Sequence, residues 1–343
     1  LSANYREYLL LSHIQKLKED KVLLLDEKGQ AEWLIKNIKP CLLKNGVVQY
    51  YLNPNDYTKK VDETDADITT GTDGNVMIEF PLIYYKFYEE TDINNVVWTG
   101  CKFSLTPQDD TWCANAFLNI NGVIQETMYM AAYDGYVNNN ILYSLSGKAP
   151  SNKITIGGFR TYATANGSGY QQQEWSKRVL LQSIFVMMFK STDSQTALGR
   201  GYVDGNSSAT TTGKTNEKGF MYGETTGKQQ MKFLGIEDFW GNLLQWIDGL
   251  VSDSAYDLLI GNSNFNDTGS GSGYTKYPSG ISANTAGYVD KVQGGNEKGF
   301  IIKTKNGSET THYADYGDLS SSRVLYFGGD YSSGSLSGFT DLR

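Results

Sequence analysis

The chain contains GIEDFWGNLLQWIDG at residues 235–249, the most specific pattern in its 343 residues. Trp240 and Trp246 each bring a large apolar surface, about 200 Å², that folding would bury. Gly241 permits a tight turn between them. Asp238 and Asn242 can hydrogen-bond loop backbone that no sheet satisfies. We interpret these five residues as a structural scaffold.

A second pattern, RVLYFGGDYSSGSLSGF, follows at residues 323–339. Gly328 and Gly329 would let the backbone pass close to another strand, with Tyr331 packing beside it. Residues 332–337 are Ser, Gly and Leu, which suit adaptable contacts on a fixed scaffold, as in antibody combining sites. An ordinary polar hairpin loop also accounts for this composition.

Before both patterns, residues 174–190, EWSKRVLLQSIFVMMFK, are the most strongly predicted helix of the chain. It is apolar nearly all round, which predicts a buried core helix. The apolar spacing also predicts helices at residues 5–19 and between Asp26 and Pro40. Strands are expected at residues 47–51, 76–88 and 96–105, with Pro81 at an edge or bulge. Residues 200–230 and 261–290 are long and irregular, which is uncommon unless such loops are functional.

The composition limits the classes of partner. The net charge of −8 argues against nucleic acid, because phosphate binding needs a basic surface. No run of about 18 apolar residues is present, so we expect no membrane insertion. Cys41, Cys101 and Cys113 form no disulfide framework, and we expect small buried side chains. A Cys101–Cys113 bridge stays open as an alternative.

With Gly157-Gly158-Phe159 and the apolar helix, the two patterns resemble the C-type-lectin-like fold in its formylglycine-generating-enzyme-like branch. That branch carries G-x-x-D/N-x-W-G-N-x-x-x-W and, later, R-x-x-x-G-G-x-W/Y. The resemblance implies an α+β fold, with a lectin-like ligand-binding domain at residues 76–343. A strand-rich connector at 46–75 and an N-terminal helical appendage at 1–45 would precede it. The matching residues, which the resemblance makes scaffold, are Gly235, Asp238, Trp240, Gly241, Asn242 and Trp246, then Arg323, Gly328, Gly329 and Tyr331.

In this branch the second motif lies in the variable region of proteins diversified by retroelements, including phage receptor-binding tail proteins. The stretches at residues 38–56 and 74–87 also resemble phage tail proteins. The resemblance therefore implies a non-enzymatic adhesin of a phage tail in the virion, which binds a host cell-surface protein or glycan. A homotrimer or attachment to other tail proteins is left open. A bacterial cell-surface protein of the same fold is the alternative. The implied ligand contacts are Tyr316, Ser320, Ser322, Leu325, Tyr326, Asp330, Ser332, Ser333, Ser335 and Leu336.

The resemblance has one departure near the end of the chain. The family carries a further strand beyond the position of Phe339, whereas this sequence has only four more residues, to Arg343. We expect either that Gly338-Phe339 does the work of that strand or that the end is truncated.

Enzymatic activity is not expected. The branch's namesake enzymes use a C-terminal cysteine pair, and this chain has no Cys after Cys113. Neither His13 nor His312 accompanies a G-x-S-x-G nucleophile motif. Adjacent carboxylates such as Asp109-Asp110 point to opposite faces of a strand and make poor glycosidase pairs. A carbohydrate-active enzyme with more distant carboxylates stays as an alternative.

No cofactor is expected, except that loop oxygens could hold a structural calcium ion. The two candidate segments are Asp204-Gly205-Asn206 and Asn264–Asp267.

Overall fold

A computed structural model of the chain describes residues 32–343 except 96, 272, 280–285, 309–315 and 319–320. The helix expected at residues 5–19 lies outside the described residues, as do His13, His312 and Ser320. The described part mixes helices and strands, with strands predominating, which makes the fold α+β. None of its helices is long and apolar enough to cross a membrane.

The larger sheet has five antiparallel strands in the order β3-β2-β1-β4-β7. It begins right after the short helix α2 (Glu32–Asn37), which ends before Pro40 as expected. Residues 46–75 supply two of the strands, so the sheet runs across the expected boundary between connector and domain at residue 76. The strands are β1 (Lys39–Lys44), β2 (Val47–Asn53), β3 (Asp56–Lys60), β4 (Asn75–Pro81) and β7 (Thr127–Ala131).

The single strand expected at residues 76–88 is two strands. β4 ends at Pro81, and the chain resumes as β5 (Tyr84–Thr91), which forms a hairpin with β6 (Val97–Ser104). β1 begins opposite Glu79, so Pro81 pairs only with Thr127 of β7. A proline lacks the N–H that a strand paired on both sides would use, which is why the sheet ends there.

A second sheet has the order β14-β13-β12-β19, and its neighbouring strands β12 and β19 contain part of the first and part of the second sequence pattern. Its strands are β12 (Gln245–Ser252), β13 (Leu258–Gly261), β14 (Tyr274–Tyr277) and β19 (Arg323–Phe327). The described residues also form these two-stranded pairs: β8 (Tyr136–Asn138) with β9 (Ile141–Tyr143), β10 (Lys232–Phe233) with β11 (Ile236–Glu237), β15 (Gly287–Tyr288) with β18 (Tyr316–Gly317), and β16 (Lys291–Gly295) with β17 (Gly299–Thr304).

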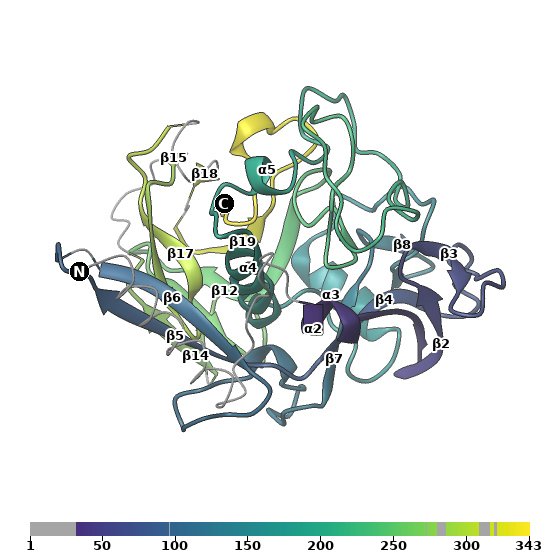
Figure 1. Cartoon of the computed structure of the whole chain (residues 1–343), viewed down its shortest axis with the longest axis horizontal. Coiled ribbons are helices and arrows are strands. Elements are labelled where there is room, and N and C mark those ends of the chain that lie inside the picture. Colours follow the sequence, from purple (N-terminus) through teal and green to yellow (C-terminus); the bar gives the residue numbers. More distant parts are fainter. Residues whose placement is uncertain (1–31, 96, 272, 280–285, 309–315, 319–320) are drawn as a thin grey trace, which may run out of the picture.

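Helix α4 (Trp175–Phe189) confirms the buried helix expected at residues 174–190 and appears at the centre of Figure 1. Its Trp175 ring stacks on Phe327 of β19, with ring centroids 5.2 Å apart. Its Phe185 ring contacts Trp240 and Phe339 at centroid distances of 5.7 and 4.8 Å. One helix therefore packs against both sequence patterns.

The other helices are short. They are α3 (Ile156–Thr164), α5 (Ser194–Ala197) and the 3-10 turns η1 (Asn115–Phe117) and η2 (Gly334–Leu336). Cys41 is buried, Cys101 and Cys113 are half-buried, and all three are free thiols. One apolar core joins side chains from α2 to Leu342, which places both sheets around a common centre.

Candidate functional site

Successive side chains of strand β19 point alternately into the core and towards the surface. Leu325 and Phe327 are buried, and Val324 and Tyr326 on the other face are half-buried. Leu325 is 1% exposed, so the ligand contact that the family resemblance implied is wrong for its side chain. The Arg323 side chain is exposed, so it contributes to the scaffold only through its backbone, which exchanges hydrogen bonds with the Ser252 hydroxyl.

The two glycines after β19 turn the chain across the first pattern. Gly328 and Gly329 have φ of 93° and 70°, in the left-handed region that favours glycine. The Gly328 carbonyl accepts a hydrogen bond of 2.8 Å from the amide of Gly241. A Cβ at position 329 would overlap the Ser337 hydroxyl and lie 2.7 Å from the Ser337 Cβ. The two patterns therefore contact each other through the backbone of Gly241 and Gly328, and both of these residues have the positive φ that favours glycine.

The residues of the first pattern hold the surrounding loops. The Trp240 indole N–H donates to the carbonyls of Gly199 and Arg200 at 3.1 and 3.2 Å. The Asn242 amide donates to the Asp238 carboxylate at 2.9 Å, and its oxygen accepts from the Thr210 amide at 2.8 Å. Trp240, Asp238 and Asn242 are fully buried, which agrees with a scaffold role.

Trp246 is half-buried, and its indole N–H donates to the Ile154 carbonyl at 3.2 Å. Its ring meets Tyr326 edge-on, with centroids 5.4 Å apart. Tyr326 thus packs on the face of the sheet that also carries Trp246.

Residues 330–336, which we call the tip, form a compact turn after the glycines. The Asp330 carboxylate accepts from the Ser332 amide at 2.9 Å and from the hydroxyls of Ser332 and Ser333 at 3.0 and 2.9 Å. Tyr331 donates its amide proton to the Asn242 carbonyl at 3.1 Å. Short side chains that bond to nearby backbone stabilise such turns without regular structure.

The loop at residues 200–206 and helix α5 brace the tip from the other side. Gly334 donates its amide proton to the Val203 carbonyl at 2.9 Å. The Gln195 amide donates to the carbonyls of Gly334 and Ser337 at 2.9 and 2.7 Å. Part of the long loop at 200–230 therefore adjoins the tip, as the sequence suggested. In Figure 1 the tip is the yellow segment beside α5.

Two tyrosines adjoin the tip. Tyr316 of β18 meets Tyr288 of β15 edge-on at a centroid distance of 5.5 Å. The Tyr288 hydroxyl lies 3.0 Å from the Ser335 hydroxyl, within hydrogen-bonding distance. Sequence reasoning missed Tyr288 as a single residue, although it lies in the loop at 261–290 that was singled out. A tyrosine inside a Gly- and Ser-rich stretch was the available signal.

The last residues of the chain complete this end of the sheet. Leu342 forms bridges with Gly317 and with Phe327. The Arg343 backbone exchanges two hydrogen bonds with Tyr326, of 2.9 and 3.1 Å. Residues 342–343 therefore pair with β18 and β19, whereas the sequence left open whether Gly338-Phe339 takes that place or the end is truncated.

The predicted contacts do not all gather in one place. Ser322 lies at the start of β19, where its amide donates to the Asp253 carbonyl, and the tip follows the other end of that strand. Ser320 lies outside the described residues. Of the predicted ligand contacts, Ser322 and Ser332 are exposed. The half-buried ones are Tyr316, Tyr326, Asp330, Ser333, Ser335 and Leu336.

A cluster of acids, Asp134, Glu237 and Asp238, includes two residues of the first pattern. Burial is the main cause that raises the pKa of Asp134 to about 7 and the pKa values of Glu237 and Asp238 as well. The neighbouring carboxylates add to the shift of Asp238. Burial also lowers the pKa of Lys232 to about 7, while its amine donates to the Thr215 carbonyl at 2.7 Å.

In both segments considered for calcium, the aspartate is paired with an arginine. Asp204 is bound by the Arg200 guanidinium through both oxygens. Asp267 is paired with Arg160. Among the described residues, no group of three or more His, Cys, Asp or Glu side chains is arranged to hold a metal ion.

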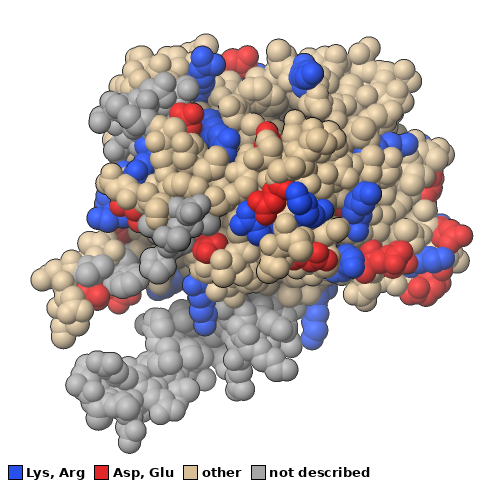
Figure 2. All heavy atoms as spheres, turned by 90° about the horizontal axis from the view of Figure 1, so that it is seen from above, with Lys and Arg blue, Asp and Glu red and all other residues tan. Residues whose placement is uncertain are grey.

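Figure 2 shows the upper face of the molecule, where charged side chains are scattered between broad uncharged areas. The tip consists of Ser, Gly, Tyr and Leu residues and one carboxylate, Asp330, whose Oδ1 accepts hydrogen bonds from the serines. Chemically, the site offers hydroxyls and aromatic edges on a fixed backbone.

No protein-family model matches the sequence, and no curated protein is similar to it. Any function must therefore be argued from the residues of this chain.

Proposed function

We propose that this protein is a non-enzymatic receptor-binding protein with a C-type-lectin-like domain. The tip, together with Tyr288 and Tyr316, would contact the target. The observation that supports this proposal most is the bracing of the tip. Buried residues hold its backbone at Tyr331 and Gly334, while four of its seven residues are Ser or Gly.

A braced backbone with small side chains suits a binding surface for two reasons. Binding costs less conformational entropy when the contact residues are already ordered. Short side chains can also be exchanged without disturbing the scaffold, because the hydrogen bonds that hold Tyr331 and Gly334 use backbone atoms. Ser332, the exposed member of the tip, shows this separation most clearly.

The resemblance of residues 38–56 and 74–87 to phage tail proteins, and of the second pattern to the variable region of diversified tail proteins, supports a place in a virion tail. The target would be a protein or glycan of a host cell surface. On this proposal the tip is also hypervariable. A near-repeat of the coding sequence for residues 316–339 beside a reverse-transcriptase gene would support this, and absence of such a template would contradict it.

The binding experiment uses fluorescently labelled protein on a panel of intact bacterial isolates, measured by flow cytometry. Wild-type protein should bind at least one isolate. Ser332→Arg places a long charged side chain on the tip and should weaken that binding about tenfold or more. Ser168→Arg makes the same change at an exposed serine before α4 and should leave affinity within about twofold.

Three outcomes would contradict the proposal. Wild-type protein could bind no isolate, both arginine variants could bind equally well, or the protein could hydrolyse a glycan of the bound surface. The last result would favour a carbohydrate-active enzyme.

A further inference from the structure

A polar pocket of about 310 Å³ lies between helix α3, strand β12 and the segment after β13. None of its lining residues belongs to the tip. Its volume falls at the lower end of the range of small-molecule sites, about 300–1,000 Å³. It equals roughly ten liquid waters, which is room for one sugar ring.

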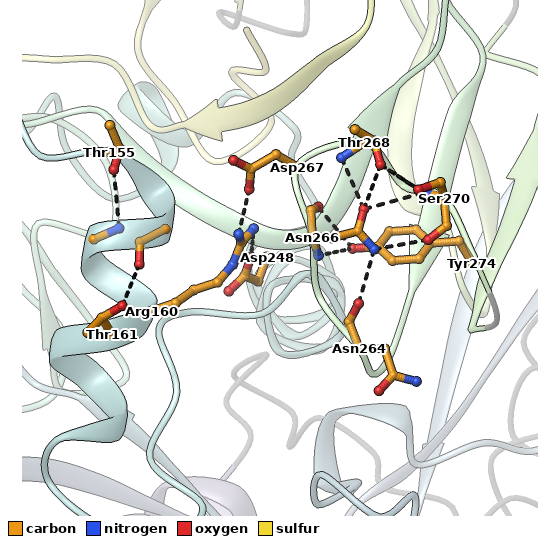
Figure 3. A network of polar contacts seen from close by, with 12 residues as sticks. Thr155, Arg160, Thr161, Asp248, Asn264, Asn266, Asp267, Thr268, Ser270 and Tyr274 are labelled. Atoms are coloured by element: carbon orange, nitrogen blue, oxygen red, sulfur yellow. Dashed lines mark hydrogen bonds and ion pairs between the residues drawn. The ribbon is translucent and has the colours of Figure 1, made fainter.

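An ion-paired arginine forms one wall of the pocket. Arg160 of α3 donates through Nε to Asp248 Oδ1 at 2.7 Å, and its Nη1 contacts Asp267 Oδ1 (Figure 3). Asp248 is 1% exposed and Arg160 is half-buried. Two carboxylates therefore offset the single positive charge, so the wall does not attract an anion such as a phosphate or a carboxylate.

Carboxamides line much of the remainder. They are Gln171 and Gln172 before α4, and Asn262 and Asn264 after β13. Gln172 is 8% exposed, and its Nε2 has no hydrogen-bond partner in the described part of the chain. A carboxamide offers both donors and an acceptor, as a pair of neighbouring sugar hydroxyls does. A buried donor without a partner is unusual and favours a ligand or water at this wall.

Two apolar side chains complete the pocket. Phe265 is half-buried and packs beside Gly249, where an added Cβ would lie 3.0 Å from its ring. Ile120 is 51% exposed at the rim. Aromatic and aliphatic walls can cover the C–H faces of a sugar ring while the amides bind its hydroxyls.

The loop that carries Asn264 and Phe265 is fixed in place. The Asn266 side chain accepts from the Thr268 amide at 3.0 Å and donates to the carbonyls of Asn264 and Ser270 at 3.1 and 3.0 Å (Figure 3). The pocket wall is thus preorganised, which reduces the entropy cost of binding a weak ligand.

We infer that this pocket binds one ring of a neutral saccharide, at a site separate from the tip. Amides and Asp248 would bond its hydroxyls, and Phe265 would cover one ring face. The compensated charge of Arg160 selects against acidic sugars and sugar phosphates.

The test is saturation-transfer NMR and titration of the full chain with glucose, galactose, mannose, N-acetylglucosamine, maltose and lactose, and with glucuronate and glucose 6-phosphate. At least one neutral sugar should show saturable binding to the protein, with a dissociation constant on the order of 1 mM or lower. The two anionic sugars should bind about tenfold more weakly or not at all.

Two variants on α3 form a matched pair. Thr164 is exposed and lines the pocket, so Thr164→Trp should fill it and weaken binding about tenfold or more. Thr161 is exposed on the same helix but outside the lining, so Thr161→Trp should keep wild-type affinity. Gln172→Leu keeps the side-chain size, removes the amide and should also weaken binding.

The inference is overturned if no neutral sugar shows saturable binding, if Thr164→Trp and Thr161→Trp bind the sugar with equal affinity, or if the anionic sugars bind most tightly. Ser332→Arg should leave saccharide binding unchanged. A loss of cell binding without a loss of sugar binding would thus separate the tip from the pocket.

Discussion

The amide of Gly241 donates a hydrogen bond of 2.8 Å to the carbonyl of Gly328, and this contact joins the two sequence patterns. The strands that carry them, β12 and β19, pair antiparallel, with Trp246 opposite Tyr326. The tip follows directly from Gly328-Gly329. Its position is therefore set by backbone geometry.

Alanine at position 329 should be strongly destabilising. Gly329 has a φ of 70°, and an added Cβ would overlap the Ser337 hydroxyl. Left-handed strain and overpacking together should lower the free energy of unfolding by about 3 kcal/mol. The measurement is urea denaturation followed by tryptophan fluorescence.

Gly46→Ala is the control for this substitution. Gly46 has a similar φ of 75°, but a Cβ there would meet no atom within 4 Å. Strain alone should cost about 1 kcal/mol. If alanine lowered the free energy of unfolding equally at positions 46 and 329, close packing of residue 329 against Ser337 would not contribute to the effect.

Arg178 should be essential for stability although it is a charged residue in the core. It is 0% exposed, its guanidinium lies 3.8 Å from the centre of the Phe239 ring, and it donates to the carbonyls of Phe239 and Phe339. Arg178→Met should remove the donor to the Phe239 carbonyl, whereas the Phe339 carbonyl keeps the Gln182 amide at 2.6 Å. The substitution should cost on the order of 3 kcal/mol in thermal or chemical unfolding.

Arg200→Met serves as the comparison, because Arg200 is half-buried and pairs with Asp204 near the surface. It should cost about 1 kcal/mol or less. If Arg178→Met were as mild, the link between α4 and the two patterns would not be a main source of stability.

The buried acids predict that stability depends on pH. A carboxyl with a raised pKa in the folded state binds more protons when folded. Its contribution to stability therefore falls as the pH rises from its unfolded pKa of about 4 towards its folded pKa, which is about 7 for Asp134. Asp134, Glu237 and Asp238 all act in this sense. Lys232, with its pKa lowered to about 7, acts oppositely above neutral pH, so stability should rise again there.

Asp238→Asn should remove part of this dependence, because asparagine keeps the shape and tolerates the φ of 54° at this position. The unfolding midpoint at about pH 7.5 should rise relative to wild type, and its difference from about pH 5 should shrink. Asp110→Asn, at an exposed aspartate, should change neither value. An unaltered pH profile in Asp238→Asn would show that this carboxyl does not carry the effect.

Sequence alone was sufficient for elements that local patterns determine. Helix α4 was predicted within one residue at each end because its apolar residues run nearly all round. The scaffold roles of Trp240 and Asn242 followed from their residue types, and both are buried as expected. The break after Pro81 was predicted only as an edge or bulge, because it depends on where β1 begins.

The site was harder to predict because tertiary contacts assemble it. Tyr288 reaches Ser335 from 47 residues away, and Gln195 reaches Gly334 from 139 residues away, distances over which sequence patterns give no register. Leu325 was assigned by motif position, whereas strand alternation turns its side chain into the core. Burial decides such cases, and it is a property of the packed structure.

Selective labelling is available for a direct test of the tip. Burial raises the pKa values of Cys41 and Cys113 to about 12 and raises that of Cys101 as well, so their thiolates are scarce at neutral pH. A cysteine introduced at an exposed position should therefore react first.

The decisive measurement attaches a photo-crosslinker to Ser332→Cys and, in parallel, to Ser168→Cys, and irradiates each protein on cells that wild-type protein binds. The tip proposal predicts a crosslink to a surface protein or glycan from position 332 and none from position 168. Crosslinks from position 168 alone, or equally from both positions, would contradict it.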